Sequence, residues 1–148
     1  MTGINHTLVG AIVGLTVKQP YLVAPIAFAS HFVCDSLPHF GRVKNMKHWD
    51  RTFTTILFID ATACFTALAI ILLTWPTLWQ AAVVGMFFAA LPDFTWLIFG
   101  KRKLPKNAFY RFHSWLQWGE RPYGWIYELL YCALFILVLH KLMITQVS

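Results

Sequence analysis

Long apolar runs separated by short polar interruptions dominate the hydropathy pattern of this chain. Several of the runs approach the roughly 20 residues that an α-helix needs to cross the hydrocarbon core of a bilayer. Turn signals such as Lys18-Gln19-Pro20 and Thr74-Trp75-Pro76 separate neighbouring runs. The pattern predicts five membrane segments of alternating direction, at residues 4–17, 21–37, 53–73, 78–99 and 123–143. The first corresponds to only about 21 Å of helix, which is shorter than the hydrocarbon core.

A different pattern appears between the fourth and fifth segments, at about residues 108–118. Phe109, Phe112 and Leu116 recur at helical spacing, and His113 lies beside this apolar stripe. A basic run over residues 101–106 comes just before it. An amphipathic helix with aromatic and basic residues is typical of the membrane–water interface. We therefore expect an interfacial helix here.

The composition indicates a membrane domain rather than a soluble domain. Of the 148 residues, 58% are hydrophobic and only 12% are charged, and the mean hydropathy is +0.59. Soluble domains carry about 25% charged residues. We therefore expect a single membrane domain over residues 1–148, built as a compact all-α bundle. The first residues show no basic region followed by a cleavage site. The three cysteines lie in apolar runs and are interpreted as packing residues.

The excess of basic residues then bears on orientation and partners. There are 12 Lys and Arg against 6 Asp and Glu, and most of the cations lie near residues 41–51 and 101–121. In so apolar a chain they indicate anionic lipid headgroups as partners rather than nucleic acid. The positive-inside rule then predicts a multi-pass protein of a prokaryotic inner (cell) membrane, with the N-terminus in the cytoplasm and the C-terminus outside.

Alternating direction also gathers the polar residues at the cytoplasmic end. All the carboxylates and all the histidines except His140 fall on that side. Four residues separate His31 and Asp35, so the two side chains share one face of a helix. Pro38 is expected to end that helix and to place His39 on the loop beyond it. The alternative reading is a satisfied core histidine with two unrelated polar neighbours.

Carboxylates within the hydrocarbon region are costly unless they are paired, so each is a functional candidate. Here Asp35, Asp60, Asp93 and Glu128 would repel one another, and a divalent cation would relieve that repulsion. Imidazole nitrogens combined with carboxylate oxygens suit Zn²⁺, with Mn²⁺ or Fe²⁺ as alternatives. The number of candidate ligands is sufficient for one or two ions, and two ions could share a bridging carboxylate as in metal-dependent phosphoesterases.

Several short motifs resemble a known family. These motifs are Asn5-His6-Thr7-Leu8-Val9-Gly10, the run SHFVCDSLPHF at residues 30–40, Ala90-Leu91-Pro92-Asp93, and His113-Ser114. Together they resemble small prokaryotic integral-membrane proteins classed as membrane-bound metal-dependent hydrolases. Asp93 is followed here by Phe-Thr-Trp, where family members often carry a further acid and a histidine, which leaves the metal count open. The His-x-x-x-Asp pair is also similar to that of zinc-dependent phospholipase C and P1 nuclease. The resemblance implies metal-dependent hydrolysis.

Three functions remain open at this stage. The first is a metal-dependent hydrolase that acts on a lipid or lipid-linked phosphoester at the cytoplasmic face. The second is an ion- or proton-coupled transporter, and the third is a non-catalytic metal-binding scaffold. For the hydrolase, the expected metal ligands are His31, Asp35, His39 and Asp93, with His6 and His113 as further ligands or as side chains that orient them. Asp60 or Glu128 is expected to be the general base or a bridging ligand. The sequence does not indicate the oligomeric state.

Overall fold

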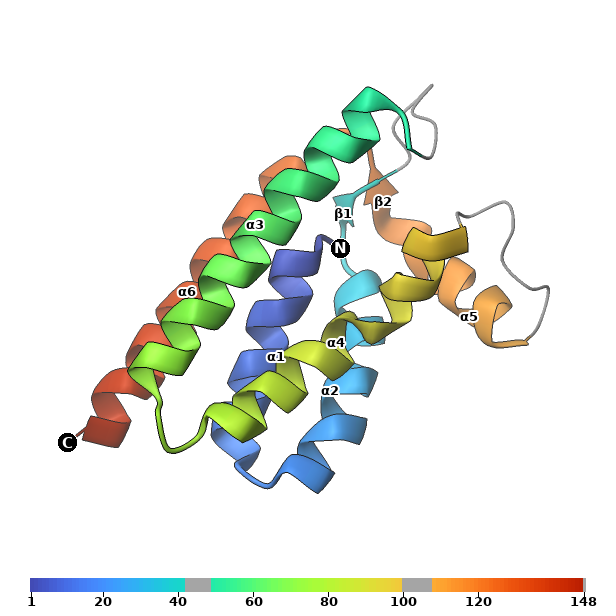
Figure 1. The fold of residues 1–148 in the computed structure, drawn as a ribbon. Coiled ribbons are helices and arrows are strands. Elements are labelled where there is room, and N and C mark those ends of the chain that lie inside the picture. Colours follow the sequence, from blue (N-terminus) through green and yellow to red (C-terminus); the bar gives the residue numbers. More distant parts are fainter. Residues whose placement is uncertain (42–48, 100–107, 148) are drawn as a thin grey trace.

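Helices make up most of the protein in a computed structural model that describes residues 1–41, 49–99 and 108–147 (Figure 1). The helices of this part of the chain are α1 (Gly3–Val17), α2 (Pro20–Asp35), α3 (Arg51–Thr74), α4 (Trp79–Phe99), α5 (Ala108–Leu116) and α6 (Trp125–Val147). A 3-10 turn over Gln117–Gly119 follows α5. The expectation of an all-α fold is thus confirmed for the described residues, apart from one small strand pair.

That strand pair joins the segments after α2 and after α5. Strand β1 (His39–Phe40) pairs in parallel with β2 (Glu120–Arg121), and His39 lies opposite Glu120. Two-residue strands give no periodic signal, so the sequence pattern did not predict them. The pairing ties the end of α2 to the start of α6.

The helix boundaries agree with the predicted segments to within a few residues, and the largest difference is at the end of α6, which reaches Val147 instead of residue 143. Helix α2 ends at Asp35, two residues before the predicted end. The Ser36 amide still hydrogen-bonds to carbonyls of the last turn. Pro38 disfavours the α conformation at Leu37 and has no N–H group to continue the helix. The chain therefore leaves the helix just after Asp35.

Helix α1 is the centre of the bundle and packs against α2, α3, α4 and α6. Its contact with α4 is made by backbone as much as by side chains. A Cβ added at Gly10 would meet the Gly85 carbonyl oxygen, and one added at Gly85 would meet that of Gly10. Glycine at both positions therefore permits the close approach of the two helices. Other helices surround α1, so few of its residues are exposed.

The packed interior beyond the polar end is apolar. Leu8, Ala11 and Leu15 of α1 contact a cluster that includes Ile71 of α3 and Leu139 of α6. Much of the outward-facing surface is apolar as well. Phe58, Phe65 and Leu73 on α3 are exposed by 73%, 71% and 84%, and α6 likewise exposes many large apolar side chains. Water would not favour such surfaces, whereas lipid would.

Two helices of the described chain are long and apolar enough to cross a membrane, namely Arg51–Thr74 and the part of α6 over Trp125–Thr145. Helix α1 and the stretch Trp79–Phe94 of α4 are apolar but shorter. The predicted crossing of the membrane by five segments therefore remains a proposal. Most residues of the two basic loops, at 42–48 and 100–107, lie outside the described residues, so their predicted placement at one membrane face stays a prediction.

Candidate metal centre

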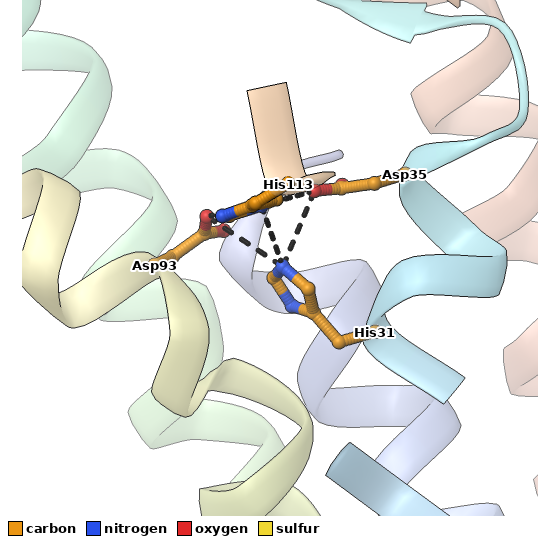
Figure 2. A group of neighbouring side chains, drawn as sticks. All are labelled: His31, Asp35, Asp93 and His113. Carbon is orange, nitrogen blue, oxygen red and sulfur yellow. Dashed lines mark hydrogen bonds and ion pairs between the residues drawn. The ribbon is translucent and has the colours of Figure 1, made fainter. Parts of the chain in front are cut away.

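Four side chains from three helices meet at the polar end of the bundle. His31 and Asp35 come from α2, Asp93 comes from α4 and His113 comes from α5 (Figure 2). Each offers one ligand atom, and these four atoms lie within 4.8 Å of one another. We refer to these four residues as the metal group. The same four residues were among the ligands expected from the sequence, and the structure brings them together at a site that could hold a metal ion.

The distances within the metal group suit a small tetrahedral ion. His31 Nε2 and His113 Nε2 lie 3.2 Å and 2.9 Å from Asp35 Oδ2, and 3.1 Å from each other. Asp93 Oδ1 lies farther away, 3.8 Å from His31 Nε2 and 3.9 Å from His113 Nε2. Zinc bonds of about 2.0–2.1 Å in a tetrahedron place neighbouring ligands about 3.3 Å apart. The distances between ligand atoms given above, from 2.9 Å to 3.9 Å, lie on either side of that value.

The hydrogen bond on the far side of His31 fixes which nitrogen faces the metal group. His31 Nδ1 lies 2.8 Å from the carbonyl oxygen of Ala89, so it donates its hydrogen there. Neutral His31 then directs the lone pair of Nε2 towards Asp35 Oδ2 and His113 Nε2. His31 Nε2 and Asp35 Oδ2 are then two acceptors that face each other, and they repel unless a proton or a cation lies between them. A ligating histidine whose other nitrogen donates to a carbonyl is the usual arrangement in metal sites.

Exposure distinguishes Asp93 from the other members of the metal group. Its side chain is 30% exposed, whereas His31, Asp35 and His113 are buried. Asp93 follows Pro92, which lies inside α4. Proline has no N–H to bond the preceding turn, and such positions bend helices. Asp93 is therefore the member of the metal group that solvent reaches.

His6, another expected ligand, lies against the metal group from α1. Its Nε2 is 3.2 Å from Asp35 Oδ1 and 3.7 Å from Asp93 Oδ2. Its ring stacks on that of His31, with 4.1 Å between centroids and 21° between planes. Both carboxylates therefore contact histidines through both of their oxygens.

The structure places the other expected site residues outside the metal group. His39 lies in β1, where Nδ1 is 2.7 Å from the Leu37 carbonyl oxygen. Asp60 of α3 accepts hydrogen bonds from the backbone N–H groups of Gly3 (2.8 Å) and Ile4 (2.9 Å), at the start of α1. A carboxylate at this position stabilises a helix N-terminus. The role of His39 as a metal ligand and that of Asp60 as a base or bridging ligand stay predictions.

Glu128 of α6 holds the same N-terminal segment. Its carboxylate accepts hydrogen bonds from the Thr2 backbone N–H and hydroxyl, from Asn5 Nδ2 (2.7 Å) and from the Phe40 backbone N–H (3.0 Å). These donors come from α1, from its N-cap and from β1. Glu128 therefore joins three elements at the polar end, and its predicted role as a base or bridging ligand stays a prediction.

The cation beside the metal group was missed by the sequence analysis. The Met1 ammonium lies 2.6 Å from Asp35 Oδ1, and both groups are fully buried. Burial alone would lower the pKa of this ammonium, but the charges of Asp35, Asp93 and Glu128 outweigh it and raise the pKa. Within the described residues, Asp35, Asp60, Asp93 and Glu128 form no ion pair with a lysine or arginine side chain. Among the described residues, the Met1 ammonium is thus the one cation other than histidine in an ion pair with these four carboxylates.

A second missed residue is Gln117, one turn beyond His113. Its Nε2 lies 3.5 Å from Asp35 Oδ2 and 3.4 Å from His113 Nε2. The four-residue spacing between His113 and Gln117 could have indicated this neighbour, although Gln117 lies in the 3-10 turn rather than in α5. Its amide can help to orient the carboxylate of Asp35.

The metal group as a whole could hold a divalent cation between two imidazoles and two carboxylates, and the Asp93 carboxylate is partly exposed. Comparison with known proteins adds no assignment: no family model matches the chain, and it has no match among curated proteins or solved structures.

Proposed function

We propose that this protein is a membrane-embedded, metal-dependent hydrolase that acts on a lipid or lipid-linked phosphoester at the cytoplasmic face. The observation that carries the proposal is the metal group itself, in which three members are buried and Asp93 is partly exposed. A purely structural zinc site is closed by its ligands, whereas a catalytic site keeps a position for water or substrate.

The buried members of the group match the ligand count of catalytic zinc. His31, Asp35 and His113 would supply three protein ligands, and the partly exposed Asp93 would share the fourth position with water. A divalent ion held there would lower the pKa of water and polarise a phosphoryl oxygen. Zinc fits the donor set best, and Mn²⁺ or Fe²⁺ are alternatives.

The chain itself would have to accept a proton from the attacking water. The sequence pointed to Asp60 or Glu128 for this role, but the oxygens of both accept hydrogen bonds from the N-terminal segment. Either would have to release these donors to act as a base.

The exposed aromatic side chains of α5 and of the segment that leads to α6 support a substrate at the lipid headgroup level. Helix α5, which supplies His113, exposes Phe112 and Trp115 by 48% and 68%. Trp118, Tyr123 and Trp125 continue this aromatic surface towards α6, and each is more than half exposed. Tryptophan and tyrosine favour the membrane–water interface. This end of the bundle would then lie among the headgroups, where phosphoesters are found.

The transporter alternative receives less support. A carrier needs polar groups along the whole path through the membrane. Past the level of Thr7 and Glu128, the packed interior of the described residues is the apolar cluster of Leu8, Leu15, Ile71 and Leu139. The metal-binding scaffold remains a distinct outcome of the experiment below.

The test is turnover by the detergent-purified protein. Phospholipids and lipid-linked phosphates would be presented in mixed micelles, with Zn²⁺, Mn²⁺ and Fe²⁺ supplied in turn, and released headgroup or phosphate would be measured. We expect hydrolysis by the wild type, loss of it in His113→Ala, and its retention in His140→Ala, which removes an exposed histidine elsewhere on α6. Bound metal without turnover on any lipid would favour the scaffold instead.

A further inference from the structure

The two aspartates of the metal group divide their oxygens between two sets of histidines. Asp35 directs Oδ2 to His31 and His113, at 3.2 Å and 2.9 Å, and directs Oδ1 to His6 at 3.2 Å. Asp93 shows the same division: Oδ1 lies 3.8 Å from His31 Nε2, and Oδ2 lies 3.7 Å from His6 Nε2. Each carboxylate thus lies between His6 on one side and the His31–His113 pair on the other.

His6 itself is buried in a way that hydrogen bonding alone does not explain. Its side chain is fully buried, and Nδ1 has no hydrogen-bond partner among the described residues. The ring is held by stacking on His31, and Nε2 makes its polar contacts with Asp35 and Asp93. The position of Nε2 carries the argument, because it faces one oxygen of each aspartate, as the ligand atom of a shared metal position would.

The number of carboxylates at this end of the bundle also favours a second cation. Asp35, Asp60, Asp93 and Glu128 supply four carboxylates at this end, and the Met1 ammonium is the cation that contacts Asp35 Oδ1. One divalent ion would leave this region with an excess of negative charge. A second divalent ion would offset charge that the first leaves, and an ion with an open coordination position can bind a hydroxide or an anionic phosphoester.

We infer that His6 Nε2, Asp35 Oδ1 and Asp93 Oδ2 form a second cation position, so that both aspartates bridge two divalent ions. The inference rests on the proposed function, because the first ion belongs to the metal group. Carboxylates that bridge through both oxygens hold ions about 3.5–4 Å apart, as in two-metal phosphoesterase sites. The ion at His6 shares Asp35 Oδ1 with the Met1 ammonium or displaces it. The substrate class that fits such a centre is an anionic phosphoester, which both ions would contact.

Manganese provides the test because its paramagnetism reports both number and proximity. The detergent-purified chain would be stripped with a chelator, loaded with Mn²⁺ and desalted, and then examined for metal content and by electron paramagnetic resonance. We expect two Mn²⁺ ions per chain in the wild type, with the exchange-coupled signal of a close pair. His6→Ala should retain one ion and give an uncoupled signal, and His140→Ala should behave as the wild type.

The outcomes separate the second position from the first. One ion per chain in the wild type would overturn the inference, and this measurement needs no variant to fold. Two ions in His6→Ala would overturn it as well. If the wild type holds one ion that His31→Ala loses and His6→Ala keeps, the metal group stands without the second position. A wild type that binds no ion would overturn both.

Discussion

His113 Nε2 lies 2.9 Å from Asp35 Oδ2, although 78 positions of the chain separate the two residues. One side chain comes from helix α5 and the other from the last turn of α2. The metal group therefore depends on how α5 is seated against the bundle. Several measurable consequences follow from this arrangement and from its neighbours.

The first prediction concerns metal-dependent stability. Adding Zn²⁺ to the stripped wild type should raise its melting temperature, because an ion that binds only the folded state stabilises it by about 2.7 kcal/mol at a hundredfold excess over Kd. Asp35→Ala should abolish the rise, since Asp35 contacts both histidines of the metal group. His140→Ala should keep it. An unchanged melting temperature of the wild type in Zn²⁺ or Mn²⁺ would contradict the proposed centre.

The second prediction concerns the contact between α1 and α4. Gly85→Ala should destabilise the protein by about 1–3 kcal/mol or more, because the new methyl group meets the Gly10 backbone. Since α1 carries His6 and α4 carries Asp93, the same change should weaken metal binding. Leu137→Ala, at a site 66% exposed on α6, is the control and should change neither property in detergent. Thermal unfolding and metal content would be measured, and a Gly85→Ala variant with wild-type values would refute the close approach.

The third prediction concerns Glu128. Glu128→Gln replaces an acceptor of several hydrogen bonds with a group that is half donor, so it should cost about 1–3 kcal/mol of stability. The measurement is thermal unfolding of wild type and variant under the same metal loading. A catalytic role would show separately: a variant that keeps its metal but loses turnover by about 10²- to 10⁴-fold would identify Glu128 as the base. Unaltered stability would contradict the anchoring role.

The fourth prediction concerns pH. Burial, and then the Met1 ammonium, lower the pKa of His39 in the folded protein from an ordinary value of about 6.5. The unfolded chain therefore binds a proton more readily, so stability is fully present above about pH 6.5 and falls as the pH drops through the folded pKa. Unfolding of metal-free protein between pH 7.5 and 5 should show this loss, and His39→Gln should show a shallower one. Parallel curves for the two proteins would contradict it.

The fifth prediction concerns membrane topology. In a variant without native cysteines, Tyr123→Cys should react with an impermeant thiol reagent only from the cytoplasmic side, because it lies at the polar end of the bundle. Gln19→Cys, in the exposed turn between α1 and α2, should react only from outside. The membrane would then lie between the two positions, as the five-segment arrangement requires. Labelling of both from one side would exclude that arrangement.

The local part of this organisation could be predicted from the sequence. Apolar runs and turn residues located the helices, because hydropathy and chain breakers act over a few residues. The spacing of His31 and Asp35 predicted that both would face one site, because helical periodicity fixes the relative directions of residues four apart. Alternation of the segments also brought His6, Asp93 and His113 to the same end of the bundle.

Only the tertiary structure decided what each of these residues contacts. His39, Asp60 and Glu128 share the polar end with the metal group. His39 contacts the Leu37 carbonyl oxygen, and backbone N–H groups at the start of α1 and in β1 donate to Asp60 and Glu128. The division of the aspartate oxygens between His6 and the His31–His113 pair depends on how closely α1 approaches α4 at Gly10 and Gly85. Sequence spacing fixes directions along one helix, but distances between helices depend on packing across the whole bundle.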